Sequence, residues 1–176
     1  MNHISIDIET YSSVDIKKSG LYKYVQSDDF DVLLFAYSFN NAPVRIVDLT
    51  AGESISGCIV HLMFSPDCIL HAYNAAFEWY CLSKYFGLSE GQRTQWLSKW
   101  HCTMLHGLYC GFPSGLAAVG DALGLPQDKK KMGIGKALIN YFCKPCKPSS
   151  ANGNRMRNLP HHAPEKWGLF KTYCVQ

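Results

Sequence analysis

The chain has 176 residues, of which 47% are apolar and 18% charged, which excludes a disordered or fibrous protein and suits one globular domain. No apolar run is long enough to span a membrane, and the first six residues do not resemble a signal peptide, so we expect a cytoplasmic protein. Residues 1–90 hold five Lys/Arg and eleven Asp/Glu (net −6), whereas residues 91–176 hold twelve and three (net +9). A basic half suits a polyanionic partner, although a solvated surface without a partner would have the same composition.

The first predicted element is a strand over His3–Glu9. Ile4, Ile6 and Ile8 alternate with polar residues, so the isoleucines face one way and the polar side chains face the other.

A hairpin is predicted next. Asp31–Phe39 is an apolar, aromatic-rich strand, and Asn40-Asn41 forms a turn into a second strand over Val44–Leu49. A short helix over about Ile55–Phe64 and another strand over Cys68–Ala72 follow.

Helices dominate the rest of the predicted structure. Asn74 is a favourable N-cap for a helix over Ala75–Phe86, and Lys99–Cys102 predicts a short fifth strand. Residues 143–164 are rich in Pro, Asn, Gly and Ser and predict a long loop. The other predicted helices are Thr103–Cys110, Gly115–Leu123, Ile134–Phe142 and one from about Glu165 to the chain end. This order favours an α/β fold with a mixed sheet and helices on both faces, without an interdomain linker.

Asp7 and Glu9 are the most informative acids in the sequence. Two residues apart on a strand, they leave the same face about 7 Å apart at the backbone. The flanking isoleucines indicate a central strand, where two like charges require a shared proton or a cation between them. A divalent ion with oxygen ligands meets that need. From this pattern alone, an edge strand with two solvated acids remains an equal alternative.

Glu78 is a second candidate. It shares a helix face with Cys81, Leu82 and Tyr85, which places the acid toward the core. The alternative is an ordinary acid in a first helical turn, favoured there by the helix dipole. Tyr173, on the last helix, is by itself best explained as a packed core residue.

Together, three segments resemble the motifs of the DEDD (DnaQ-like) 3′→5′ exonucleases. Asp7–Thr10 (DIET) resembles the first motif, D-x-E. Asn74–Glu78 (NAAFE) resembles the second, N-x-x-(F/Y)-D, with Glu in place of Asp. Tyr173–Gln176 (YCVQ) resembles the start of the third, Y-x-x-x-D, whose aspartate would be the next residue. The tyrosine marks the DEDDy subtype of family A DNA polymerases. The wider resemblance is to the phage-type members and includes Tyr11–Tyr24, His101–Met104, Lys136–Ile139 and Tyr141–Pro148.

The resemblance implies a fold and an activity. The fold would be RNase H-like, an α/β domain over residues 1–176 with a five-stranded mixed sheet, its first strand central, truncated before its last carboxylate. The activity would be proofreading by hydrolysis of DNA 3′ ends, releasing nucleoside 5′-monophosphates with two Mg²⁺ or Mn²⁺ ions. The partners would be a single-stranded DNA 3′ end and a polymerase domain in the same protein, with no membrane.

The resemblance also implies roles for individual residues. Asp7 would bridge both metal ions, and Glu9 would complete one metal site. Glu78 would serve the second ion, directly or through water, and Tyr173 would orient the attacking water. The residues expected to contact the substrate are Thr10, Asn74 and Phe77.

Two departures from the family pattern limit this expectation. Glu78 is one methylene longer than the usual Asp, and the third-motif aspartate is absent from the sequence. We therefore expect this chain to bind the water-activating metal poorly and to hydrolyse DNA slowly. The alternatives are a non-catalytic module of the same fold that binds single-stranded nucleic acid, and an exonuclease that acts on RNA.

Cys143-Lys144-Pro145-Cys146 is a single C-x-x-C motif. With His161 and His162 it could form a zinc site, but there is no second C-x-x-C and the histidines are adjacent, so this is the less favoured interpretation.

A basic stretch interleaved with Tyr141 and Phe142 could hold the phosphates and stack the bases of a single strand. The alternative is a solvated face with buried aromatic residues. The stretch comprises Lys129, Lys130, Lys131, Lys136, Lys144, Lys147, Arg155 and Arg157.

Overall fold

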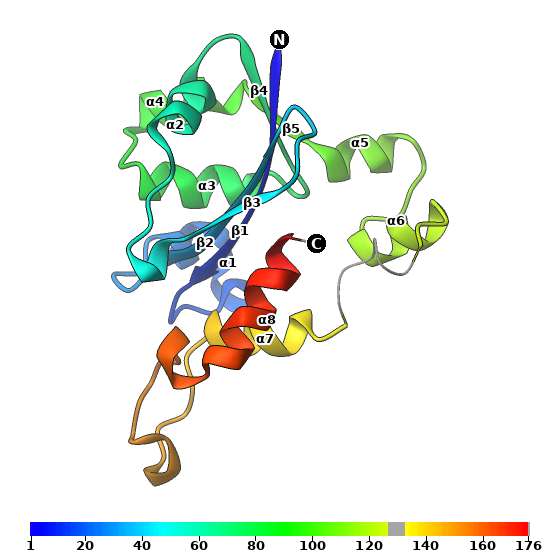
Figure 1. Cartoon of the computed structure of the whole chain (residues 1–176). Coiled ribbons are helices and arrows are strands. Elements are labelled where there is room, and N and C mark those ends of the chain that lie inside the picture. The colour runs from blue at the N-terminus through cyan, green and yellow to red at the C-terminus, as the bar shows by residue number, and fades with distance from the viewer. Residues whose placement is uncertain (127–132, 176) are drawn as a thin grey trace.

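A mixed five-stranded sheet forms the centre of the protein in a computed structural model that describes residues 1–126 and 133–175 (Figure 1). The strand order is β3-β2-β1-β4-β5, so β1 is central. It pairs with β2 antiparallel and with β4 parallel. The strands are β1 (Asn2–Tyr11), β2 (Asp31–Phe39), β3 (Arg45–Asp48), β4 (Cys68–Ala72) and β5 (Trp100–Cys102). The predicted five-stranded α/β fold with its first strand central is therefore confirmed.

Helices cover both faces of the sheet, as the sequence predicts (Figure 1). Six helices do so in the described ranges: α1 (Ile16–Val25), α2 (Gly57–Phe64), α3 (Ala76–Tyr85) and α4 (Glu90–Leu97) on one face, and α7 (Gly135–Phe142) and α8 (Pro164–Val175) on the other. Helices α5 (Thr103–Tyr109) and α6 (Leu116–Ala122) extend away from the sheet (Figure 1). Short 3-10 turns at Leu49–Ala51, Ser150–Asn152 and Pro160–His162 interrupt the connecting segments.

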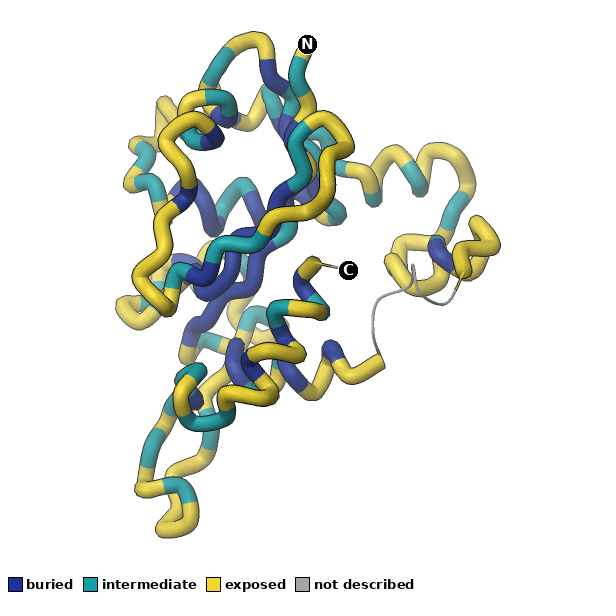
Figure 2. Tube along the Cα trace, viewed as in Figure 1, coloured by how far each residue is buried: buried dark blue, intermediate teal, exposed yellow. Residues whose placement is uncertain are grey.

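Two apolar clusters hold the layers together, one on each side of the sheet. On one side the three β1 isoleucines pack with buried residues of α1 to α4. On the other, Leu33, Leu34 and Ala36 of β2 pack with α7 and α8. Buried segments accordingly follow the strands and the inner sides of the helices in Figure 2. The acids of β1 point to the side of α7 and α8.

The β2–β3 hairpin confirms the predicted turn. Asn40 and Asn41 both have positive φ, 49° and 61°, and the Ala42 N–H donates to the Phe39 carbonyl, as in a type I′ turn, from which residues 42–44 lead into β3. Near the start of β2, Glu9 pairs with Leu34 but Thr10 pairs with Val32, so Leu33 is an extra residue. This β-bulge lies beside Glu9 and Thr10 of β1. Bulges often redirect neighbouring side chains in this way next to a functional site.

Some predicted boundaries are wrong. Asn74 is not a helix cap: it has φ 66° and lies in a turn, and the cap of α3 is Ala75. An asparagine tolerates this left-handed conformation better than most residues do. Helices α1 and α4 were not predicted, since α1 contains Gly20 at φ 79° and α4 has few apolar residues.

Asp48, at the end of β3, fixes α8 to the sheet. It is 5% exposed and accepts hydrogen bonds from Trp167 Nε1 (2.7 Å) and Thr50 Oγ1 (2.6 Å). Lys171 Nζ, one turn after Trp167, lies 3.5 Å from the same carboxylate. Burial alone would raise the pKa of Asp48, but these hydrogen bonds and the lysine charge lower it below its usual value.

We expect Asp48→Ala to lower the free energy of unfolding by about 2–4 kcal/mol, because it leaves the Trp167 N–H buried without an acceptor. Since the folded-state pKa is lowered, the contribution of Asp48 is present above the unfolded-state pKa of about 3.9. It is lost as the pH falls through the lower folded-state pKa. Urea unfolding at pH 7 and pH 3 measures both effects, with the exposed Asp67→Ala as the control. Equal losses for the two variants at pH 7 would contradict the role of Asp48.

Candidate metal and nucleic-acid site

A pocket of about 570 Å³ lies between the end of β1, the start of α3 and the α7–α8 pair. Six of the seven predicted site residues line it, although they come from three distant parts of the chain. They are Asp7, Glu9, Thr10, Phe77, Glu78 and Tyr173. Asn74 is exposed and does not line this pocket.

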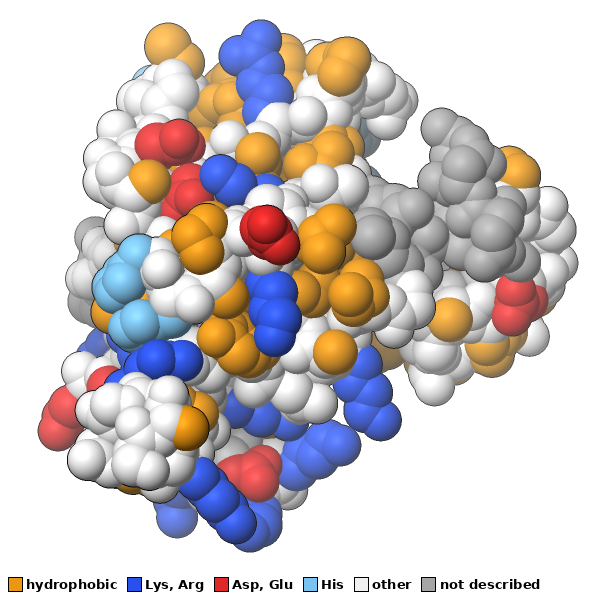
Figure 3. Space-filling view, turned by 60° about the horizontal axis from the view of Figure 1, so that its bottom comes forward, with side chains coloured by type: hydrophobic (Ala, Val, Ile, Leu, Met, Phe, Trp, Pro, Cys, Tyr) orange, Lys and Arg blue, Asp and Glu red, His pale blue; other side chains and the backbone are white. Residues whose placement is uncertain are grey.

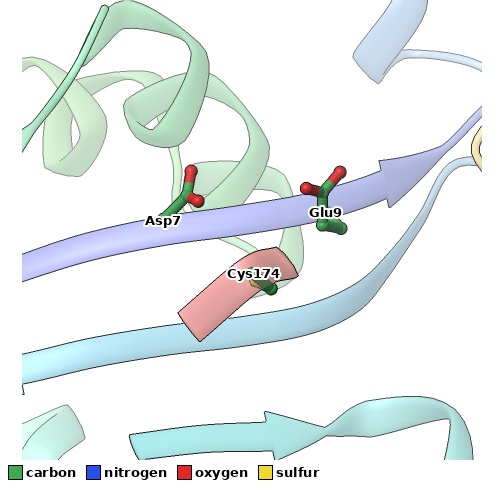
Figure 4. A group of neighbouring side chains, drawn as sticks. All are labelled: Asp7, Glu9 and Cys174. Atoms are coloured by element: carbon green, nitrogen blue, oxygen red, sulfur yellow. The ribbon is translucent and has the colours of Figure 1, made fainter. Parts of the chain in front are cut away.

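Asp7 and Glu9 leave the same face of β1 (Figure 4). Glu9 is 8% exposed and Asp7 is half-buried, on a strand with a neighbour on each side. The alternative of an edge strand with two solvated acids is therefore excluded. One potential ligand atom from each of Asp7, Glu9 and Cys174 lies within 4.8 Å of the other two. Two carboxylates at this separation suit a hard divalent cation.

Glu78 is buried in the first turn of α3, with 4% of its surface exposed. The predicted neighbours Cys81 and Leu82 are buried with it, but Tyr85 is 42% exposed, so Tyr85 does not belong to the core-facing side. Oε2 of Glu78 has no hydrogen-bond partner. Burial raises the pKa of the Glu78 carboxyl well above its usual range, and the charges of Asp7 and Glu9 add to the rise. A buried carboxylate oxygen without a partner, in a pocket that also contains Asp7 and Glu9, could accept a cation, although Glu78 is not one of the three residues whose ligand atoms converge within 4.8 Å.

Glu78→Gln should therefore stabilise the protein in metal-free buffer at pH 7 by about 1 kcal/mol or more. It removes a buried negative charge that lies near two other acids, and it keeps the shape of the side chain. The folded-state pKa is raised, so the wild type loses stability as the pH rises from the unfolded-state value of about 4.3 toward the folded-state pKa. The difference between the two proteins should vanish near pH 4. Urea unfolding in EDTA across this range checks it, and a difference that does not change with pH would contradict it.

Tyr173 reaches the pocket from α8. Its ring lies nearly parallel to that of Phe170, with centroids 6.2 Å apart, and a Cβ on Gly135 would clash with it. Thr10 makes a buried 2.7 Å hydrogen bond with the hydroxyl of Tyr24, so its side chain is held from within the protein. Phe77 is half-buried beside Tyr24, with ring centroids 6.2 Å apart.

Two cysteines near Glu9 were not predicted to belong to the site around the acids. The Cys143 thiol, 6% exposed, donates a 3.7 Å hydrogen bond to Glu9 Oε2, and Cys174 lies beside both acids. Burial, with the Glu9 charge adding to it, raises the pKa of the Cys143 thiol, which keeps the proton on the sulfur. Nothing in the local sequence indicates these contacts, because they join residues more than 130 positions apart.

The structure does not bring together the residues of the less favoured zinc interpretation. The Cys143 thiol donates to Glu9 Oε2, whereas the Cys146 thiol donates to the backbone oxygen of Arg155 at 3.3 Å. In residues 1–126 and 133–175, the group of potential metal ligands that converges is Asp7, Glu9 and Cys174, and neither His161 nor His162 belongs to it.

The basic stretch is only partly available for a ligand. Phe142 is buried in the core, so it cannot stack a base as predicted. Arg157, predicted to hold phosphates, already pairs with Asp31 (2.8 Å) and lies over the ring of Tyr11. Lys144 lines the pocket, as does Lys17 of α1. Figure 3 shows Lys and Arg side chains gathered over the lower part of the molecule. Lys129, Lys130 and Lys131 lie outside the described residues.

Comparisons with known proteins give one strong similarity of sequence. No known family profile matches the chain. It is 47% identical, over all 176 residues, to the DNA polymerase of Bacillus phage SP02, and it spans 26% of that protein's length.

One solved structure has a similar fold at low sequence identity. Brucella melitensis NrnC with bound Mg²⁺ matches 97% of this chain and 72% of its own, with a TM-score of 0.51 and 12% identity. One chain in the structure of the yeast NOT1 MIF4G domain co-crystallized with CAF1 matches 71% of this chain and 69% of its own, with a TM-score of 0.47 and 13% identity. The NrnC match supports the RNase H-like α/β fold. None of the helices described has the length and apolar character needed to cross a bilayer.

Proposed function

We propose that the chain is a polymerase-associated 3′→5′ exonuclease domain of the DEDDy type, which hydrolyses single-stranded DNA from its 3′ end. The observation that carries the proposal is the meeting of three separated motifs in one pocket: Asp7 and Glu9 from β1, Glu78 from α3 and Tyr173 from α8. The full-length similarity to a segment of a phage DNA polymerase supports the polymerase association.

The residues of the pocket fit a pair of divalent ions. Asp7 and Glu9 offer oxygen ligands within 4.8 Å of each other, and Glu78 offers a buried oxygen without a partner. Asp7 would contact both ions, Glu9 one of them, and Glu78 the other. When bound, two Mg²⁺ or Mn²⁺ ions would lower the pKa of the attacking water and counter the charge on the leaving 3′ oxygen.

The other side chains would position the substrate. The Tyr173 hydroxyl would orient the water, and the partly exposed ring of Phe77 offers a face for the terminal base. Thr10 would guide the end of the strand through its backbone, because its hydroxyl is bonded to Tyr24. Lys17 and Lys144 at the pocket would attract the phosphates.

Labelled oligonucleotides test the proposal. The substrates are a single-stranded DNA with a 5′ label and the same strand with a 3′ label, incubated with Mn²⁺, Mg²⁺, Ca²⁺ or EDTA. The proteins are the 176-residue chain and a form extended by Asp-Ala-Ala after Gln176. With Mn²⁺ or Mg²⁺, and not with Ca²⁺ or EDTA, we expect the first cleavage to release the 3′ label as a mononucleotide. The 5′-labelled strand should shorten one nucleotide at a time.

Other outcomes would overturn the proposal. Release of a mononucleotide from the 5′ end would contradict the direction, and faster hydrolysis of a matched RNA would contradict the substrate. Binding of the strand, measured by fluorescence anisotropy, without hydrolysis by either protein would favour a non-catalytic single-strand-binding module.

A further inference from the structure

We propose that helix α7 is a positioning element for the site, in which Gly135 sets the place of the Tyr173 ring and Cys143 holds the carboxylate of Glu9. The inference rests on the proposed function for its catalytic meaning, but the two contacts can be tested without it. Gly135 begins α7 and Cys143 directly follows its last residue, so one rigid helix contacts two of the expected site residues.

Position 135 needs a glycine because there is no room for a side chain, and not because of its backbone conformation. It is buried, and a Cβ built on it would lie 2.5 Å from Cζ and 2.8 Å from Cδ2 of Tyr173. Its φ is not positive, so any residue could adopt its backbone, and glycine in a helix costs about 0.5–1 kcal/mol relative to alanine. The close approach of the ring explains the glycine. Cζ carries the hydroxyl, so any side chain at this position would move the group expected to orient the water.

The ring of Tyr173 is also tied to α7 through α8. Phe170 lies nearly parallel to Tyr173 (6.2 Å between centroids, 11° between planes) and to Phe142 of α7 (5.5 Å, 14°). Trp167 completes the cluster at 4.8 Å from Phe142. Phe142 and Phe170 are 1% and 0% exposed, so the two helices pack as one unit. A shift at Gly135 therefore acts on Tyr173 within a rigid surrounding.

At the other end of α7, the Cys143 thiol donates to Glu9 Oε2 at 3.7 Å. Cys143 is 6% exposed and Glu9 is 8% exposed, so water has little access to replace this donor. A thiol is a weak donor. It leaves Glu9 a strong ligand while restricting its rotamer, as hydrogen bonds behind metal ligands commonly do. Together the two contacts fix the spacing between the carboxylate of Glu9 and the hydroxyl of Tyr173.

The Gly135 contact is tested by a stability cycle. In the wild type, Gly135→Ala should lower Tm because the new methyl group meets the ring. In the Tyr173→Ala background the space is empty, and the same change should raise Tm by about 2–4 °C, because alanine favours a helix. The sign of the change in Tm can be compared between the two backgrounds even if Gly135→Ala in the wild type is strongly destabilised. The same direction of change in both backgrounds would overturn the contact.

The positioning role needs kinetics on the chain extended by Asp-Ala-Ala after Gln176. Gly135→Ala should lower kcat roughly ten- to a hundredfold with KM for the oligonucleotide unchanged. In the Tyr173→Phe background it should have almost no further effect, because the hydroxyl it displaces is gone. Equal losses in both backgrounds would show a general structural defect and overturn the role of Gly135.

The Cys143 contact is tested by Mn²⁺ binding, followed by calorimetry. Cys143→Ala should weaken binding roughly three- to tenfold, and Cys143→Ser, which keeps a donor, should restore most of it. Cys68→Ala removes another buried thiol, remote from Glu9, and should leave Mn²⁺ binding unchanged. Serine no better than alanine would overturn the role of Cys143. Absence of hydrolysis by the parent protein would instead refute the proposed function, while the Tm and Mn²⁺ comparisons would still decide both contacts.

Discussion

Replacing Asp7 with asparagine should abolish metal binding and reduce hydrolysis on the order of a thousandfold or more, the largest loss expected from any single substitution. Of the two acids of β1, Asp7 has the larger electrostatic effect on Glu78, and its oxygen lies within 4.8 Å of the ligand atom of Glu9. In the proposed function it is the residue that contacts both ions. Asparagine keeps the shape but removes the charge, so the fold should survive.

The matched control is Asp15→Asn. Asp15 lines the same pocket but serves as the N-cap of α1, accepting a 2.9 Å hydrogen bond from the backbone N–H of Lys17. Asparagine caps helices about as well as aspartate does. The control should therefore keep both Mn²⁺ binding, measured by calorimetry, and the rate of mononucleotide release. Equal losses for the two variants would show a general electrostatic effect and refute a specific role for Asp7.

Local patterns in the sequence predict several features of this site. The alternation of Ile4, Ile6 and Ile8 with acids on the other side correctly predicts a central strand with Asp7 and Glu9 on one face. The helical spacing of Glu78 from Cys81 and Leu82 correctly predicts a buried acid. These features depend on the period of one element, which the sequence contains in full.

What the local patterns miss depends on contacts between distant segments. The roles of Gly135 and Cys143 arise only when α7 packs against α8 and β1, so no local pattern indicates them. Helix α4 is a different case, because Ser89 and Gln92 form a capping box that the sequence does contain. In α1, a glycine with positive φ at position 20 interrupts the helical pattern and hides the element.

The site contains buried acids, which are recognisable in the sequence, and residues that position other side chains, which are not. The acids are recognisable because burial of like charges is costly and therefore rare outside a functional site. The residues proposed to position Glu9 and Tyr173 are a cysteine, a glycine and aromatics, whose importance lies in where they pack. Substitutions at the second kind should change rates and affinities gradually, whereas substitutions at the acids should remove activity altogether.

Adding one aspartate after Gln176 should have the opposite effect to Asp7→Asn and raise Mn²⁺ affinity and hydrolysis by roughly a hundredfold or more. The Cys174 thiol lies within 4.8 Å of ligand atoms of Asp7 and Glu9, and α8 is directed along the same face of the sheet. The next position after Gln176 is three residues beyond Cys174 and four beyond Tyr173, so a helix continued by one turn would place a carboxylate on their side. There it would join the two acids of β1.

Two matched extensions make this gain specific. Asn-Ala-Ala in place of Asp-Ala-Ala keeps the length and shape without the charge, and it should leave Mn²⁺ binding at the level of the 176-residue chain. Ala-Asp-Ala moves the carboxylate by one residue, which turns it about 100° around the helix axis and away from Asp7. It should recover little of the gain. If all three extensions raised the rate equally, the added length would be stabilising α8, and the site would not need a further carboxylate at that place.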